Sequence, residues 1–346
     1  MRVQDFLLAP GDFLISRSNT LDKVGRTVLF RGEIENCSYP DLLMRFRVDE
    51  TQVTNEYLEG YLRSSIVRTY IQRSASGTSG SMVKINKSTV EKIPVVLPTL
   101  PEQKAIADLL STWDEAIEKT ERLIQAKEKR FKELLRELIA EQINREKETG
   151  WKKVRIGSFL TESRIQDRDN DPKKRLSVRL HLKGVEVREY RGTESDGATA
   201  YFIRKAGQFI YGKQNIFKGA VGIVPLELDG YSSTQDIPAF DVADHVDKHW
   251  LLFLFSYSNF YKKLELYASG SGSKRLQPKE LFRMKISLPP FEVQQKIAEA
   301  LFFAQEEIDL LKQLAEKYKT QKRGLMQKML TGEWRVKQEG VKSHGK

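Results

Sequence analysis

The stretch LPPFEVQQKIAEAL at residues 288–301 is the most informative part of this sequence, because it occurs twice. Residues 97–110 read LPTLPEQKAIADLL, so Leu-Pro, Gln, Ile-Ala and Leu recur in register at an offset of 191 positions. A repeat at one fixed offset indicates a chain built from two similar units. How far the repeat extends therefore decides the fold.

The repeat continues on both sides of these stretches. PGDFLISR at 10–17 matches AGQFIYGK at 206–213, and the segment 97–139 matches 288–330. Each copy begins with β-branched and aromatic runs that are interrupted by Gly, Ser, Asp and Pro, a pattern typical of strands and turns. Because the order of these matches is kept over most of the chain, we expect two equivalent β-rich domains.

Each copy ends in a long helix with a heptad seam. Apolar residues recur at spacings that alternate between four and three, as in a coiled coil, and Thr120, Lys127 and Lys322 interrupt the seam. The predicted core residues are Ile106, Leu110, Ile117, Ile124 and Phe131 in the first helix, and Ile297, Leu301, Ile308, Leu311 and Leu325 in the second. Two equivalent helices related by a pseudo-two-fold axis pair antiparallel. The predicted fold class is α+β, with two pseudo-symmetric repeats whose helices form an antiparallel coiled coil.

Composition favours a polyanionic partner. The 346 residues include 58 Lys and Arg against 47 Asp and Glu, a formal net charge of +11, and such residues neutralise phosphates and release counterions. The single cysteine, Cys37, excludes an internal disulfide and a Cys-based metal site. No apolar run approaches the roughly 18 residues of a membrane span. We therefore expect a soluble, cytoplasmic protein with no membrane partner.

A search for catalytic residues is unproductive. The sequence contains neither a Walker A motif nor a glycine-rich loop suited to S-adenosylmethionine. His245 and His249 have the spacing of two metal ligands on a helix, but a third ligand and a counterpart in the first copy are missing. Glu102 and Lys104 suggest a nuclease motif, yet an acidic residue at a helix start is favoured by the helix dipole. We therefore predict a protein that is not an enzyme and that needs no metal or cofactor.

The Gly-rich loops of both copies carry residue types that suit DNA. Arg and Lys match guanine edges, Asn and Gln match adenine edges, and further basic residues contact phosphates. The predicted DNA-binding residues are Arg17, Ser79, Ser81 and Lys84 in the first copy, and Lys213, Gln214, Asn215, Lys218, Lys274, Arg275 and Gln277 in the second. Any one of them alone is equally consistent with a solvated loop, but as a set on a basic, repeated protein they favour DNA.

The sequence resembles the specificity subunits of type I restriction–modification systems. The resemblance rests on LPTLPEQKAIADLL and LPPFEVQQKIAEAL, each after a domain that ends in a Gly/Ser loop, and on TGW at 149–151 and TGEW at 331–334 after the helices. It implies a non-catalytic subunit in which each β-rich domain reads one half of a split double-stranded DNA target. It also implies that the helices dock two methyltransferase (M) subunits, which restriction (R) subunits join.

The resemblance also implies domain boundaries. They are a first target recognition domain at 1–96, a central helix at 97–149, a second target recognition domain at 150–287, a C-terminal helix at 288–331 and a tail at 332–346. Gly207 lies 56 positions after Trp151, whereas ten residues precede the equivalent Gly11. The first domain is therefore expected to lack its first strands and to keep an exposed sheet edge, which invites pairing with another chain.

The tail repeats the entry into the second domain. TGEWRVK after the second helix matches TGWKKVR after the first. This match predicts that Trp334 and Val336 pack on the first domain as Trp151 and Val154 pack on the second.

Two other classes of protein share some of these features. A coiled-coil scaffold with two protein-binding heads would show only nonspecific DNA affinity, and competition between DNA sequences distinguishes it. An enzyme with unrecognised chemistry is the third class, but no residue set in the sequence supports it.

Overall fold

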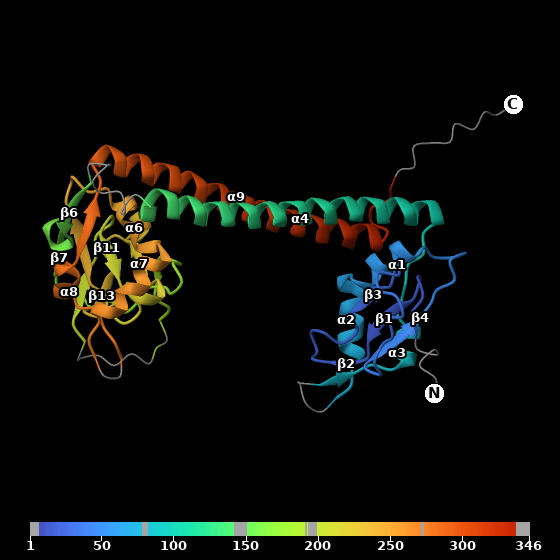
Figure 1. The fold of residues 1–346 in the computed structure, drawn as a ribbon. Helices are drawn as coiled ribbons and strands as arrows, with labels where there is room; N and C mark the ends of the chain where they lie inside the picture. The colour runs from blue at the N-terminus through green and yellow to red at the C-terminus, as the bar shows by residue number, and fades with distance from the viewer. Residues whose placement is uncertain are drawn as a thin grey trace. The chain divides into compact units, whose positions relative to one another are not determined.

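The computed structural model describes residues 7–77, 82–141, 151–190, 192, 199–270 and 273–336. The chain forms two compact units, of which unit 1 is Met1–Ile124 with Leu311–Lys346 and unit 2 is Gln125–Leu310. Both boundaries fall inside the two long helices, α4 (Leu100–Leu135) and α9 (Phe291–Leu330) (Figure 1). Each unit thus contains one β-rich domain and a part of both helices.

The domain of unit 1 is built on a small antiparallel sheet with strand order β3-β1-β4. Its elements are β1 (Phe13–Ser16), β2 (Ser18–Asn19), β3 (Thr27–Leu29), β4 (Leu43–Phe46), α1 (Asn55–Leu62), α2 (Ser65–Ser74), β5 (Val83–Lys84) and α3 (Lys87–Glu91). Strand β2 pairs with β5. The side chains of Thr54 and Ser64 cap α1 and α2, as their residue types favour.

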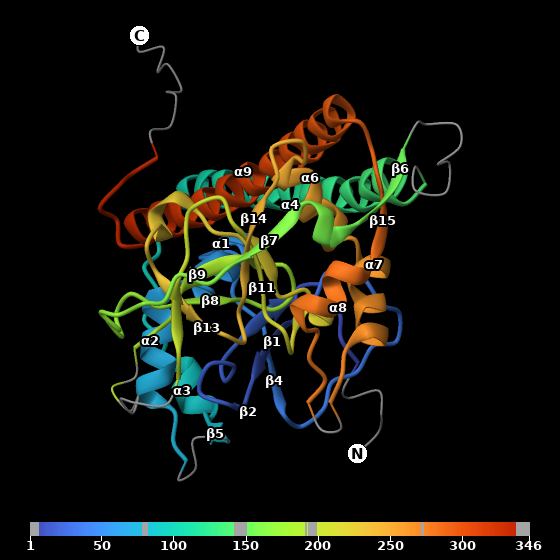
Figure 2. The same ribbon diagram turned by 90° about the vertical axis from the view of Figure 1, so that its left-hand side faces the viewer.

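The domain of unit 2 is larger and contains a sheet with strand order β12-β11-β14-β7 (Figure 2). Its strands are β6 (Lys152–Arg155), β7 (Leu160–Ser163), β8 (Leu176–Val178), β9 (Val185–Val187), β10 (Tyr201–Ile203), β11 (Phe209–Tyr211), β12 (Val221–Ile223), β13 (Ser232–Thr234), β14 (Ala239–Val242) and β15 (Lys285–Leu288). Its helices are η3 (Ile156–Ser158), η4 (Ile216–Lys218), η5 (Leu226–Leu228), α6 (Lys248–Ser256), α7 (Ser258–Lys263), η6 (Leu264–Tyr267) and α8 (Pro278–Arg283). Strand β6 pairs with β15, β8 with β9, and β10 with β13.

The two sheets share one arrangement. Phe13 of β1 pairs with Phe46 of β4, as Phe209 of β11 pairs with Phe240 of β14. In unit 2 the further strand β7 pairs with the other edge of β14. The predicted α+β fold with two repeats, each a β-rich domain followed by a long helix, is confirmed.

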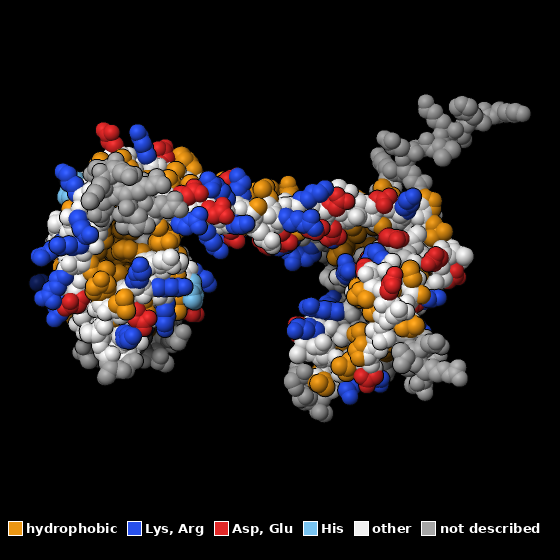
Figure 3. All heavy atoms as spheres, in the orientation of Figure 1, with side chains coloured by type: hydrophobic (Ala, Val, Ile, Leu, Met, Phe, Trp, Pro, Cys, Tyr) orange, Lys and Arg blue, Asp and Glu red, His pale blue; other side chains and the backbone are white. Residues whose placement is uncertain are grey.

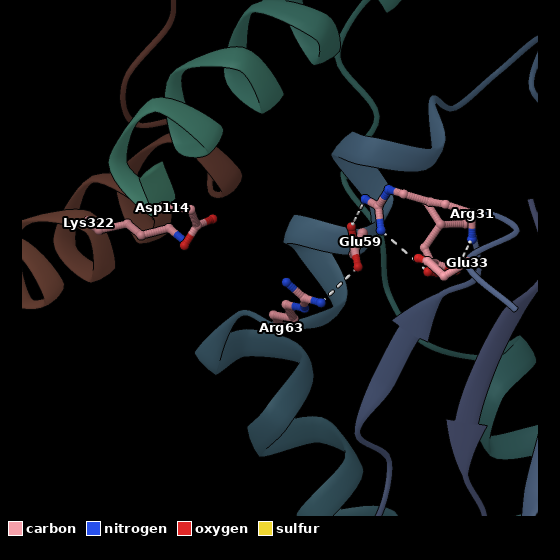
Figure 4. A network of polar contacts seen from close by, with 7 residues as sticks. Arg31, Glu33, Glu59, Arg63, Asp114 and Lys322 are labelled. Atoms are coloured by element: carbon pink, nitrogen blue, oxygen red, sulfur yellow. Dashed lines mark hydrogen bonds and ion pairs between the residues drawn. The ribbon is translucent and has the colours of Figure 1, made fainter. Parts of the chain in front are cut away.

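Within each unit the long helices run antiparallel. In unit 1, Lys319 of α9 pairs with Glu121 of α4 at 2.9 Å. Lys322, about one turn after Lys319, pairs with Asp114, about two turns before Glu121 (Figure 4). In unit 2, Lys127 Nζ lies 2.6 Å from Glu307 Oε1. The lysines that interrupt the seam, Lys127 and Lys322, therefore each have a carboxylate partner on the other helix. At the third interruption, the Thr120 hydroxyl donates to the Ala116 carbonyl at 2.7 Å.

The predicted core residues differ in depth. Ile106, Leu110, Ile297, Leu301 and Ile308 are buried, whereas Ile117, Ile124, Phe131, Leu311 and Leu325 are partly buried. Leu134 and Leu138 lie at the next seam positions of the first helix and pack, partly buried, against the core of unit 2. The neighbouring Leu135 and Ile139 are buried more deeply. The chain turns π-helical at Arg136–Glu141.

A buried glutamine explains why the opening stretch recurs. Gln103 accepts the Thr54 N–H at 2.8 Å and donates to the carbonyls of Gln52 and Pro98, both at 2.9 Å. Gln294 accepts the Asp247 N–H at 2.8 Å and donates to the Pro289 carbonyl at 2.8 Å. Thr54 and Asp247 are the N-caps of α1 and α6. Each glutamine therefore ties a long helix to the domain that precedes it.

The tail meets one half of its prediction. Val336 packs against the core of unit 1, as Val154 packs against that of unit 2. Trp334 does not: it is 50% exposed, against 7% for Trp151, and the Lys328 ammonium lies 4.4 Å from its ring centre. Glu333 stands at the place of Trp151, and Trp334 stands at the place of Lys152, which faces solvent. The prediction for Trp334 was therefore wrong.

Candidate nucleic-acid interface

Three loops predicted to bind DNA meet at the end of β11 in unit 2. The Lys213 N–H donates to the Asp236 carbonyl at 2.9 Å, and the Leu276 N–H donates to the Lys213 carbonyl at 2.9 Å. The buried Tyr211 hydroxyl donates to the Leu276 carbonyl at 3.1 Å. Lys213 is therefore held by its backbone between loops that lie far apart in the sequence.

Side chains connect the same loops. The exposed Gln214 amide donates to the Ser273 hydroxyl at 3.2 Å, and Arg275 Nε lies 3.6 Å from the Asp236 carboxylate. Ser269 and Arg275 exchange two backbone hydrogen bonds, of 3.1 and 2.8 Å, at the base of their loop. Hydrogen-bonding groups are thus concentrated on one rigid surface, as base reading requires.

Unit 1 contains the same backbone frame. The Arg17 N–H donates to the Leu42 carbonyl at 2.8 Å, and the Ile85 N–H donates to the Arg17 carbonyl at 2.9 Å. Ser76 and Lys84 exchange two backbone hydrogen bonds, of 3.0 and 2.8 Å. Arg17 therefore occupies the position of Lys213, and Lys84 that of Arg275. The sequence repeat places Arg17 opposite Lys213, but the partner loops are recognised only in the structure.

The side chains on this frame differ between the units. Leu42 of unit 1 stands where unit 2 has Asp236, so the carboxylate that approaches Arg275 has no equivalent beside Lys84. Arg17 and Lys84 are both exposed. The backbone frame is thus common, whereas its charge and hydrogen-bonding groups are specific to each unit.

The other predicted residues vary in accessibility. Lys218 is exposed, and Asn215 is a partly buried residue whose carbonyl accepts the Lys218 N–H at 2.9 Å. Burial lowers the pKa of Lys213, and Asp236 acts in the opposite direction. Lys274 pairs with Glu265 at 2.9 Å, and Gln277 is partly buried at the start of α8.

Two predicted residues, Ser79 and Ser81, lie outside the described residues.

An arginine-lined groove in unit 2 was missed by the sequence analysis. Arg175, Arg179 and Arg188 line a hollow of about 440 Å³ together with Ser233 and Thr234. The Arg175 guanidinium stacks 3.9 Å from the Tyr201 ring centre. Arg175 and Arg179 flank β8, Arg188 follows β9, and the two hydroxyl residues belong to β13, so no local pattern marks them. Ser233 belongs to the SSTQD loop at 232–236, which does carry suitable residue types.

A buried arginine, Arg204, holds Ser233, which lines the groove. Arg204 is 1% exposed, and its guanidinium donates to the Ser233 hydroxyl at 2.7 Å and to the carbonyls of Ser163 and Ile237 at 2.9 and 3.0 Å. Burial lowers the pKa of Arg204 to about 10. Arg204 thereby joins β7 to the loop that follows β13.

The backbone groups of His245 and His249 take part in hydrogen bonds near the start of α6. The His249 N–H donates to the Asp247 cap at 2.9 Å, and the His245 carbonyl accepts from Gln294 at 3.4 Å. Among the residues that the structure describes, no three His, Cys, Asp or Glu side chains gather in a way that suits a metal ion. In the same residues, no helix has both the length and the apolar character needed to cross a membrane.

Basic side chains are spread over the visible face of each unit (Figure 3). The protein has two β-rich domains, and each is tied to one of two long helices. The loops of the two domains share a backbone frame but carry different side chains. This arrangement defines a class of protein with paired recognition domains. Residues 2–128 and 150–319 match the model of the type I restriction modification DNA specificity domain. The chain belongs to this family, and the predicted relationship to type I specificity subunits is confirmed.

Individual relatives agree with this assignment. The chain is 24% identical over 355 residues to the putative type I restriction enzyme MjaX specificity subunit of Methanocaldococcus jannaschii, covering 97% of this chain and 81% of the relative. It is also 24% identical over 300 residues to the MjaVIII specificity subunit of the same organism, covering 76% of this chain and 67% of the relative.

A solved structure shares the fold. The type I restriction–modification S subunit from M. genitalium superposes with a TM-score of 0.58 at 14% identity, and the match covers 94% of this chain and 84% of that subunit. At this identity the likeness establishes the fold alone.

Proposed function

We propose that this protein is the non-catalytic DNA-recognition subunit of a type I restriction–modification complex, and that each unit reads one half of a bipartite double-stranded DNA target. Membership of the specificity family supports the role of the protein. The net charge of +11 favours a polyanionic partner. On this proposal the protein acts in the cytoplasm, where DNA and the partner subunits are found.

One observation carries the proposal of two half-sites. The two backbone hydrogen bonds that hold Arg17 in unit 1 recur around Lys213 in unit 2. Both sets have lengths of 2.8–2.9 Å. The side chains displayed on this frame nevertheless differ, as Lys84 against Arg275 and Leu42 against Asp236 show. A constant frame with variable side chains suits two domains that read different sequences in the same way.

The proposal includes docking of two M subunits on the long helices and association of R subunits with that complex. Phe302 and Phe303 support the docking, because they lie outside the seam of α9 and are 50% and 58% exposed. Adjacent exposed aromatic residues are typical of interaction surfaces. The equivalent positions of α4 are Ser111 and Thr112, so the two docking surfaces differ in apolar area.

Co-expression with an M subunit encoded beside this chain, followed by sequencing of methylated sites, tests the proposal. We expect methylation at one split sequence. Arg275→Ala should relax recognition of one half of that sequence, and Lys84→Ala should relax the other half. Lys153→Ala, at an exposed lysine on β6 away from the loops, is the matched control.

The scaffold alternative predicts a different result. DNA binding would then be equal for all competitor sequences, and none of these substitutions would alter any half-site. That outcome would refute the proposed function. Replacing Phe302 and Phe303 by Ser should separately weaken co-purification of the M subunit while DNA binding by the free chain is retained.

A further inference from the structure

The outer edge of β4 in unit 1 differs from the matching edge in unit 2. Strand β14 of unit 2 pairs on one side with β11 and on the other with β7. Strand β4 pairs on one side with β1, and within the described part of unit 1 no strand pairs with its other side. The unpaired side of β4 is called the β4 edge.

The β4 edge offers backbone hydrogen-bonding groups. The Arg17 N–H donates to the Leu42 carbonyl, so in this antiparallel pair the backbone groups of Met44 and Phe46 point toward β1 and those of Leu43 and Arg45 point away from it. The Leu43 N–H donates to the Pro40 carbonyl at 3.0 Å, so the outward donor of this edge is the Arg45 N–H. An outward N–H and carbonyl on an edge strand are a template for another strand.

An apolar groove of about 960 Å³ lies beside this edge. It is bordered by β4, by α1, by α3 and by the segment that follows α3. Its lining combines charged residues with apolar side chains, which include Met44, Phe46, Leu62, Val90, Ile93 and Val95. Figure 3 shows hydrophobic side chains at the surface of this unit among basic and acidic ones.

In unit 2 a single segment fills the equivalent place. Strand β6 pairs with β15, the Ile156 N–H donates to the Met284 carbonyl at 2.9 Å after α8, and β7 pairs with β14. Ile156, Phe159 and Leu160 of this segment are buried in the core. Residues 152–163 therefore cover the edge of β14 and fill the space beneath it.

The walls of the groove correspond to the elements that hold residues 152–163. The sequence repeat aligns β4 with β14, α3 with α8, and residues 94–97 with Lys285–Leu288 of β15. The groove is thus the place in unit 1 that a segment like 152–163 occupies in unit 2. Among the described residues, the tail matches the start of such a segment, since Val336 packs in unit 1 as Val154 packs in unit 2.

We propose that the β4 edge and its groove bind an extended segment of a second polypeptide, which adds to the sheet as a strand. The segment carries apolar residues at the spacing of Ile156, Phe159 and Leu160. Its backbone pairs with the outward groups of β4, and its apolar side chains enter the groove. This interaction adds a protein partner to unit 1.

The test uses the full chain and a labelled peptide of residues 154–163, VRIGSFLTES, with binding followed by fluorescence anisotropy. We expect saturable binding. A peptide with Phe159→Asp and Leu160→Asp should bind about tenfold more weakly, because it loses its buried apolar area.

Variants of the chain locate the bound peptide. Val95→Asp places a charge in the groove, and Arg45→Pro removes an outward backbone donor from an edge position where proline is tolerated. Each should weaken binding about tenfold. Val28→Asp, at an exposed residue of β3 on the opposite edge of the sheet, is the matched control and should leave binding unchanged.

Hydrogen exchange distinguishes the groove from the seat that residues 152–163 already occupy in unit 2. The peptide should slow exchange of the Arg45 amide and leave the Phe240 amide unchanged. Equal affinity of the apolar and aspartate-substituted peptides overturns the proposal. So does binding that survives both Val95→Asp and Arg45→Pro.

Discussion

Units 1 and 2 are alike in how each domain is attached to a helix and in the backbone frame of its loops, but they differ at the edge of the sheet. Gln103 and Gln294 make the same set of hydrogen bonds, and Arg17 and Lys213 are held in the same way. Strand β14 has two neighbours and β4 has one among the described residues. The repeated residues are therefore those that build the scaffold, whereas the side chains on its loops and the cover of its sheet are free to diverge.

The largest expected effect comes from a charge placed in the equivalent helix cores. Leu110→Asp in unit 1 and Leu301→Asp in unit 2 replace buried residues at matching seam positions, and each should destabilise its unit by about 4 kcal/mol or more. Denaturant unfolding combined with hydrogen exchange assigns the loss to one unit. Leu310→Asp, at a residue that is already exposed, should cost less than about 0.5 kcal/mol. Equal losses at Leu301 and Leu310 would contradict the described burial.

Removing the repeated glutamines tests whether the two attachments are equivalent. Gln103→Leu and Gln294→Leu each leave a cap N–H and at least one carbonyl without a partner in a buried site, which should cost about 3 kcal/mol. The exchange of the Thr54 or Asp247 amide should accelerate accordingly. Gln295→Leu, at the exposed neighbouring position, provides the control. A large effect in one unit alone would show that the repeat does not preserve the role of this residue.

Arg204→Met should affect unit 2 only. The substitution keeps an unbranched side chain, which is shorter, and removes the three donors that Arg204 gives to the Ser233 hydroxyl and to two carbonyls. We expect a loss of about 2 kcal/mol and weaker DNA binding through the neighbouring groove. The repeat places Leu8 opposite Arg204, so unit 1 has no such anchor and its exchange rates should not change. A stable Arg204→Met variant with normal DNA binding would show that the anchor is dispensable.

The smallest expected effect is a difference in acid sensitivity. Burial alone would raise the pKa of Asp12, but hydrogen bonds from Arg47 and the Ala9 N–H hold that pKa below its usual 3.8. The folded form thus favours the carboxylate, and this contribution is present above pH 3.8 and is lost as the pH falls through the lower, folded value. Unit 2 has Gln208 at the equivalent position, bonded to Asp241 at 2.9 Å.

Acid titration of the wild-type chain and of Asp12→Asn measures this difference. The variant should lose about 1 kcal/mol at pH 7 and show a flatter dependence of unit 1 stability on pH below 4. Identical pH profiles for the two proteins would mean that the Asp12–Arg47 pair contributes nothing to the acid sensitivity of unit 1.

The sequence by itself determined the repeat, the α+β class, the two long helices and the family. These follow from local and periodic signals: a seam in which apolar residues recur every three or four positions defines which helix face is covered, whatever that face contacts. The seam also located Lys127 and Lys322 as interruptions, and only the structure showed that Glu307 and Asp114 satisfy them.

Tertiary structure alone decided which distant residues meet. The burial of Gln103 depends on backbone groups about 50 positions away, and the Arg175 groove collects residues that flank β8 and β9 or belong to β13. Trp334 shows the same limit, because a shift of one position left it exposed while the motif stayed recognisable. Periodicity reports the local geometry of one element, whereas the loop frame and the β4 edge arise from hydrogen bonds and packing between elements, which leave no local pattern in the sequence.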